Sequence, residues 1–199
     1  MSARETLFPR HALAAAICSG LGLAAALPAQ ADGTFVQFDF SDAATSAVAV
    51  AVRGDISYGL SRNEYEGGHD WTASVLYRMQ FGAKNPIGLQ VGPAVRIDEE
   101  DKTLGGLRAT VDHYHPTGWG HVYLLADYTT IRNSHFAMVQ LGHRASGLGL
   151  ELAAMGDDED YQEETITATY RFGQSPFSLR LGQKLEAQET FIGFSINTF

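Results

Sequence analysis

The feature that most constrains this chain is an alternation of apolar and polar residues with a period of two, which recurs from about residue 34 to the last residues. Between Trp71 and Phe81, for example, every second residue is apolar. Successive side chains of a β-strand point to opposite faces, so this pattern predicts strands with one apolar face. Turn residues such as Lys84-Asn85-Pro86 separate the segments. The sequence therefore predicts an all-β protein.

The contents of the two faces favour a membrane barrel over a soluble sandwich. The segments are about ten residues long, the length that a tilted strand needs to cross a bilayer. Aromatic residues lie near the segment ends, short turns alternate with longer acidic loops, and the chain ends on the aromatic Phe199. We expect an antiparallel up-and-down transmembrane β-barrel of about 12 strands, with ten strands and a free N-terminal segment as the alternative. Its apolar face would contact outer-membrane lipid.

The last strand departs from this pattern. Its apolar residues Ile192, Phe194 and Ile196 have the opposite phase to Phe199. We expect a β-bulge near Asn197 to bring the two phases together.

The first residues have the features of an export signal. Arg4 and Arg10 precede an apolar run, and Ala29-Gln30-Ala31 offers small residues for cleavage. This predicts a signal peptide over residues 1–31 and an outer-membrane barrel over residues 32–199, inserted by the barrel assembly machinery of a Gram-negative cell. Cys18 lies inside the leader, so the mature chain would have no thiol.

The charge balance excludes one class of partner. The formal net charge is −9, which makes nucleic acid an improbable partner. The acidic runs 98–101 and 157–160 are interpreted as solvated loop tips, since neither has the spacing of a calcium loop. Cation binding by these loops stays open, and no metal site or cofactor is predicted.

The same alternation that turns valine and leucine outward turns charged residues into the lumen. Buried charges must be paired or hydrated, so the lumen is either a structural network or a polar conduit with a basic bias. The expected lumen-facing polar set is Asp39, Arg78, Arg96, Arg108, Asp112, Asp127, Gln140, Arg144, Glu151, Arg171 and Arg180, with Lys184 in the same phase.

Catalysis is not predicted. His143 and Ser146 lie at a short turn expected in the periplasm, and Ser134 and His135 lie at an outer loop. Neither pair comes with the orienting acid that a nucleophilic site needs. No catalytic residue is assigned.

One stretch resembles a known family. Residues 127–137, followed by Leu141 to Arg144, resemble a segment of the cellulose biosynthesis-associated outer-membrane β-barrel family (BcsS-like) of alphaproteobacteria. Gly149-Leu150-Glu151 and Glu159-Asp160-Tyr161 resemble further motifs of that family, so the likeness covers mainly residues 120–172. It implies an accessory role near cellulose secretion, with Asn133, Ser134, Glu151 and Tyr161 as the family-like positions.

Three hypotheses about function follow. The leading one is a non-enzymatic outer-membrane barrel that is an accessory to exopolysaccharide, or cellulose, biosynthesis or export, with a polysaccharide or a glycan-secretion complex as its partner. The alternatives are a lipid-modifying barrel enzyme and a small-solute pore.

Overall fold

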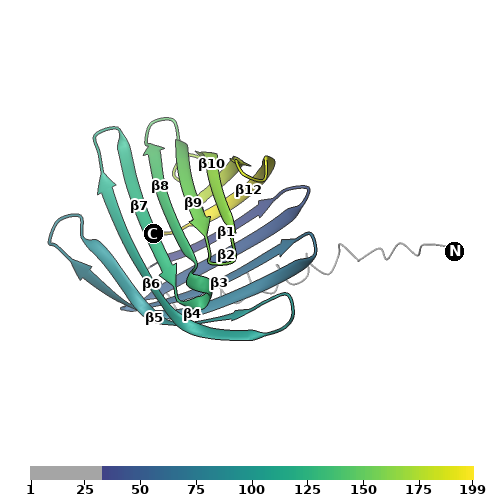
Figure 1. The fold of residues 1–199 in the computed structure, drawn as a ribbon. Coiled ribbons are helices and arrows are strands. Elements are labelled where there is room, and N and C mark those ends of the chain that lie inside the picture. The colour runs from purple at the N-terminus through teal and green to yellow at the C-terminus, as the bar shows by residue number, and fades with distance from the viewer. Residues whose placement is uncertain (1–32) are drawn as a thin grey trace. The chain divides into compact units, whose positions relative to one another are not determined.

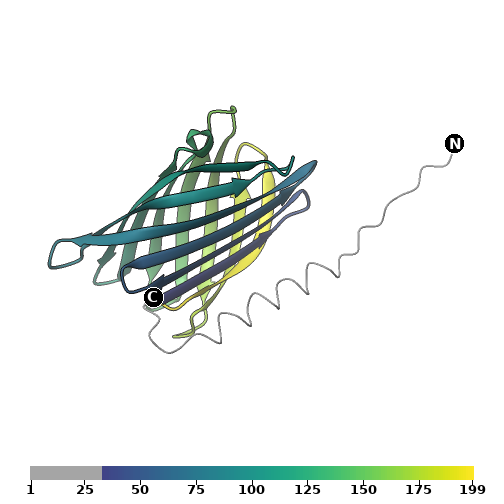
Figure 2. The same ribbon diagram turned by 90° about the horizontal axis from the view of Figure 1, so that it is seen from below.

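The computed structural model describes residues 33–199, which form one closed barrel of twelve antiparallel strands. Each strand pairs with its neighbours in sequence, and β1 pairs with β12 to close the barrel. This confirms the predicted fold class and the higher strand count. Figures 1 and 2 show the strands curving round beside one another. The strands are β1 (Gly33–Phe40), β2 (Ala44–Arg53), β3 (Ile56–Tyr65), β4 (Gly68–Phe81), β5 (Ile87–Ile97), β6 (Thr103–Pro116), β7 (Gly120–Thr129), β8 (His135–His143), β9 (Leu148–Gly156), β10 (Gln162–Arg171), β11 (Phe177–Lys184) and β12 (Glu189–Asn197).

A single short 3₁₀ turn, η1 (Ile131–Asn133), interrupts the described strands, between β7 and β8. Within residues 33–199, no helix is long and apolar enough to span a membrane. The predicted signal peptide, residues 1–31, lies outside the described residues.

The outer face of the barrel is apolar. Large apolar side chains alternate outward along nearly every strand and are exposed, including Leu107, Leu148, Leu181 and Ile192. Exposed apolar patches of this extent are found on surfaces that contact lipid or another protein. Together with the closed ring of strands, this surface makes the chain an outer-membrane β-barrel.

In β2, the larger apolar side chains of the alternating pattern face the lumen and not the outside. Val48 and Val50 pair with Gln37 and Phe35, and Gln37 hydrogen-bonds Asp39 inside the barrel. The valines of β2 therefore face the lumen, where Val52 is buried, and the alanines between them face outward. Apolar alternation alone predicts a strand but does not say which face meets lipid.

The expected bulge near Asn197 is absent from the barrel. The β1–β12 pairing runs in one register from Phe40↔Ile192 to Phe35↔Asn197. The strand simply ends there, the Thr198 N–H donates to the Thr34 carbonyl, and Phe199 lies beyond the ladder. Phe199 therefore does not have to follow the alternation of the apolar residues of β12, because it lies outside the strand. Its ring occupies the space that a side chain at Gly33 would fill.

The strand connections divide between two ends. The longer acidic loops after β5 and β9 lie at the end opposite the two termini of the barrel, and the short turns holding Asn85 and Ser146 lie at the same end as the termini. With the termini in the periplasm, as in bacterial barrels of even strand number, the acidic loops form the outer rim.

Candidate functional site: the charged lumen

One wall of the lumen, from β9 to β1, is a tightly paired charge network. Arg180 on β11 donates to both carboxylate oxygens of Glu151 on β9, at 3.1 and 3.0 Å, and to Asp39 on β1 at 2.9 Å. Only 4% of Arg180 is exposed. A two-pronged guanidinium–carboxylate contact is among the stronger ion pairs. The Arg180 guanidinium is thus enclosed by two carboxylates and joins β9 and β1 through β11.

Next to that network lies a buried hydroxyl. Thr167 on β10 lies opposite Glu151 of β9 and Gly182 of β11 in the strand register, and it is 0% exposed. Its Oγ1 has no hydrogen-bond partner among the described residues. The ring of Phe191 fills the space above Gly182, which packs this wall further.

The opposite wall, from β4 to β7, is more open. Arg108 on β6 donates to Asp127 on β7 at 2.7 Å and to Ser74 on β4 at 3.4 Å, and its side chain is 31% exposed. Thr110 donates to the same Asp127 oxygen at 2.5 Å. The carboxylate is therefore held from two sides, while part of the guanidinium faces lumen solvent.

Two further arginines lie on this wall. Arg96 on β5 contacts Asp70 at 3.4 Å, and Asn63 donates to the other oxygen of that carboxylate at 3.1 Å. Arg78 on β4 lies 3.9 Å from Asp112. Each guanidinium contacts one carboxylate only, and both Nε atoms are buried without a partner among the described residues. These arginines are held loosely compared with Arg180.

The pairing offsets the basic bias expected from the sequence. Each of these lumen arginines has a carboxylate neighbour, and Lys184 pairs with Glu189 at 2.7 Å. The lumen is thus strongly polar, with acidic and basic groups in balance along its walls.

A small polar pocket lies at the periplasmic end of this open wall. It has a volume of about 380 Å³ and is lined by Gly54, Asp55, Arg78 and Gln80. The backbone N–H of Arg78 donates to the Asp55 carbonyl at 2.7 Å. The Arg78 side chain, which is 25% exposed, borders this pocket.

Not every residue of the expected lumen set lies among these pairs. Gln140 pairs with Glu151 across β8 and β9, on the inner face. Arg171 shares the inner phase but is exposed at the periplasmic end of β10. Arg144 is not on a strand: it lies in the turn after β8 and is exposed, and its backbone N–H donates to the Trp119 carbonyl. Arg144 thus lies one residue beyond β8, which ends at His143.

The four family-like positions do not form one site. Asn133 and Ser134 lie at the outer rim, where Asn133 donates to Asp158 at 2.7 Å and the Ser134 hydroxyl donates to the Ile131 carbonyl at 2.8 Å. Glu151 lies in the lumen on Arg180, and Tyr161 is exposed in the loop before β10.

Alternation could have identified some residues that the sequence reasoning missed. Asp70 lies on the same inward face of its strand as Thr72 and Ser74. Glu163 likewise lies on the same inward face as Thr165 and Thr167. Arg132 carried no such signal, because it lies in η1, where period-two counting does not apply.

No metal or catalytic centre emerges from the described part of the chain. Within residues 33–199, no three His, Cys, Asp or Glu side chains converge on a metal position. His143 hydrogen-bonds Ser146 at 2.8 Å at the exposed periplasmic turn, and no carboxylate among the described residues joins this pair.

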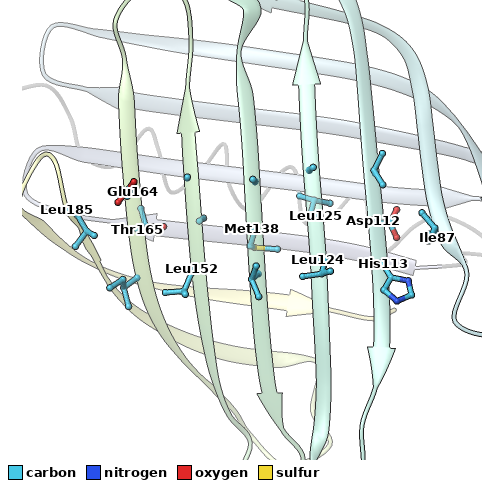
Figure 3. Close-up of a pocket in the computed structure, with 17 residues that line it drawn as sticks. Ile87, Asp112, His113, Leu124, Leu125, Met138, Leu152, Glu164, Thr165 and Leu185 are labelled. Atoms are coloured by element: carbon cyan, nitrogen blue, oxygen red, sulfur yellow. The ribbon is translucent and has the colours of Figure 1, made fainter.

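An apolar depression of about 730 Å³ lies in the wall formed by β6 to β10 (Figure 3). Ala126, Ala137 and Ala154 lie side by side across it in one register and are flanked by larger side chains such as Leu124 and Leu152. Its lining is mainly apolar, and its polar members lie toward two opposite sides in Figure 3, whereas the polar groups that orient a bound ligand usually converge. These polar residues are Asp112, His113, Glu164 and Thr165.

The fold resembles solved porins. The structure of a "KdgM porin in complex with disordered oligogalacturonate" matches with a TM-score of 0.53 and 11% identity, over 82% of this chain and 98% of that one. A second structure, of a "KdgM porin", matches with a TM-score of 0.52 and 9% identity over the same shares. At this identity the likeness establishes the barrel fold and no more.

No protein-family model matches the sequence, and neither does any curated protein. The resemblance to the cellulose-associated family therefore has no support from these comparisons, and the porins are the relatives in fold.

Proposed function

We propose that this outer-membrane barrel is a channel for small polar solutes, without enzymatic activity. The observation that carries the proposal is a contrast between arginines on opposite walls: the Arg180 side chain is 4% exposed and enclosed by carboxylates, whereas the side chains of Arg78 and Arg108 are 25% and 31% exposed. An enclosed arginine such as Arg180 can only hold the wall together, whereas a partly exposed arginine side chain can also donate hydrogen bonds to a solute in the lumen.

The chemistry of the open wall suggests the class of solute. Partly exposed guanidinium groups donate hydrogen bonds to hydroxyl and carboxylate oxygens. The carboxylates of Asp70, Asp112 and Asp127 lie beside these guanidinium groups and add hydrogen-bond acceptors to the same wall. A row that offers both donors and acceptors suits sugars and short, mildly acidic oligosaccharides. One porin of the same fold was solved in complex with oligogalacturonate, which belongs to that class.

The accessory role in cellulose export has no observation of the structure in its favour. The lipid-modifying enzyme has none either, since the Ser134 hydroxyl is engaged with a backbone carbonyl of its own loop.

Conductance tests the proposal directly. The barrel, refolded in detergent and shown to be folded by its altered migration in unheated gels, is added to planar bilayers and to liposomes loaded for swelling assays. We expect single-channel currents and entry of mono- and disaccharides.

A matched pair of variants connects the currents to the lumen. Arg108→Ala removes a guanidinium from the open wall, and Leu107→Ala changes the neighbouring residue, which faces outward. The first should alter conductance and the second should not. A folded barrel that passes neither ions nor sugars would overturn the proposal.

A further inference from the structure

The connection between β7 and β8 lies against the inner wall at the outer mouth. Ile131, its first helical residue, is only 4% exposed. It sits against Gly106, a residue with the same inward phase as Arg108, so closely that a Cβ at Gly106 would lie 2.7 Å from Ile131 Cγ1 and 2.6 Å from Thr130 Oγ1. The absence of a side chain at Gly106 thus makes room for this connection on the lumen side of β6.

One residue of that connection joins three outer loops. The Arg132 guanidinium contacts Asp98, in the loop after β5, at 3.3 Å, and Glu159, in the loop after β9, at 2.6 Å. Asp98 is itself held, because its other carboxylate oxygen accepts the N–H groups of Glu100 and Lys102 at 3.0 and 2.9 Å. Arg132 therefore sits at the junction of loops from three different hairpins.

A second set of contacts runs beside the ion pairs. The Asp158 N–H donates to the Arg132 carbonyl at 2.9 Å, and Asn133 bridges Asp158 and Tyr128, with both of its contacts at 2.7 Å. The loop after β9 is thus fastened to η1 by backbone and by side chain.

The backbone at this point is strained. Arg132 and Asn133 have φ values of 53° and 45°, two consecutive non-glycine residues in the left-handed region. Such a conformation persists only where surrounding contacts impose it. If those contacts are lost, relief of the backbone strain at Arg132 and Asn133 favours a rearrangement of the segment.

We propose that Arg132 is a latch that holds the β7–β8 connection across the outer mouth, and that its release widens the path into the lumen. The inference rests on the proposed channel function for its effect on current, but the latch itself is a property of the loops. In the closed mouth, Arg132 is bound to Asp98 and Glu159. In the open mouth, Arg132 is detached from both carboxylates.

Single-channel recording of three variants of the full barrel tests the gate. Arg132→Ala should raise the open-to-closed ratio about five- to tenfold, the lower range for coupling between a local contact and a conformational equilibrium. Arg132→Lys keeps the charge but cannot contact both carboxylates as a planar fork does, so it should fall between Arg132→Ala and the unaltered chain. Arg62→Ala is the matched control: Arg62 pairs with Glu64 at 3.2 Å and lies over the Trp71 ring, and it alternates toward the outer face.

A second measurement separates the latch from the channel. Hydrogen exchange in residues 98–102, 130–134 and 157–161 should accelerate together in Arg132→Ala and stay unchanged in Arg62→Ala. If exchange accelerates while no variant conducts, the latch stands and the channel function fails. If exchange and gating in Arg132→Ala both match the unaltered chain, the latch is wrong.

Discussion

Arg180 on β11 donates to both carboxylate oxygens of Glu151 on β9, across the one intervening strand β10, and both side chains are buried. The same guanidinium reaches Asp39 on the opposite side. One residue of β11 thus connects β9 to β1 and spans the region where the barrel closes.

This connection predicts a large effect on stability. Glu151→Ala leaves Arg180 buried with a single partner, and breaking a buried pair from one side costs about 3–5 kcal/mol. The measurement is urea unfolding of the refolded barrel in micelles, followed by tryptophan fluorescence. Glu100→Ala, which breaks an exposed pair with Lys102 in an outer loop, should leave the unfolding midpoint unchanged. Equal midpoints for the two variants would show that the buried network does not hold the closure.

The charge balance of the open wall predicts weak ion selectivity. Arg108 and Asp127 face the lumen as a pair, so the reversal potential in a KCl gradient should stay close to zero. Arg108→Ala leaves the Asp127 carboxylate without its counter-charge and should shift the potential toward cation preference. A strong anion preference in the unaltered barrel would contradict this balance of lumen charges.

The outer loops should loosen in acid. Burial acts to raise the pKa of Asp98, but the N–H groups of Lys102 and Glu100 and the Arg132 guanidinium outweigh it and lower this pKa below its ordinary value. A lowered folded-state pKa contributes stability above the ordinary pKa, and this contribution is lost as the pH falls through the folded value.

Proteolysis of the loops at graded pH checks this expectation. Protection should hold from neutral pH down to the ordinary carboxyl range and disappear only in stronger acid. In Asp98→Asn, the protease should cleave the outer loops readily at every pH. Equal protection of the two proteins at neutral pH would be inconsistent with a structural role for the carboxylate.

Phe199 should contribute little to the stability of the folded barrel. Phe199 is 59% exposed and lies beyond the last paired residue, so Phe199→Ala should change the free energy of unfolding by no more than about 0.5 kcal/mol. Phe191→Ala, which empties the space above Gly182, should cost about 3–5 kcal/mol. Urea unfolding of both variants measures the difference, and equal losses of stability would contradict these packing assignments.

The direction of a side chain could be predicted for residues inside strands but not for residues beyond the strand ends. Asp39, Arg96, Arg108 and Glu151 lie where strict alternation puts them, because a regular strand leaves no other direction for the side chain. Arg144 lies outside its strand, since β8 ends one residue before it. The inward valines of β2 show a further limit, because the pattern marks two faces without saying which is the inner one.

By itself, the sequence determined the strands and the presence of charge on one face, since these follow from a local period of two, and it left the strand count between twelve and ten. Only the tertiary structure decided which charges meet. Arg180 finds Asp39 from 141 positions away because β12 closes on β1. Arg132 gathers two carboxylates from other loops because three hairpins end at one rim. Both arrangements depend on how the strands curve into a barrel, which no local pattern can encode.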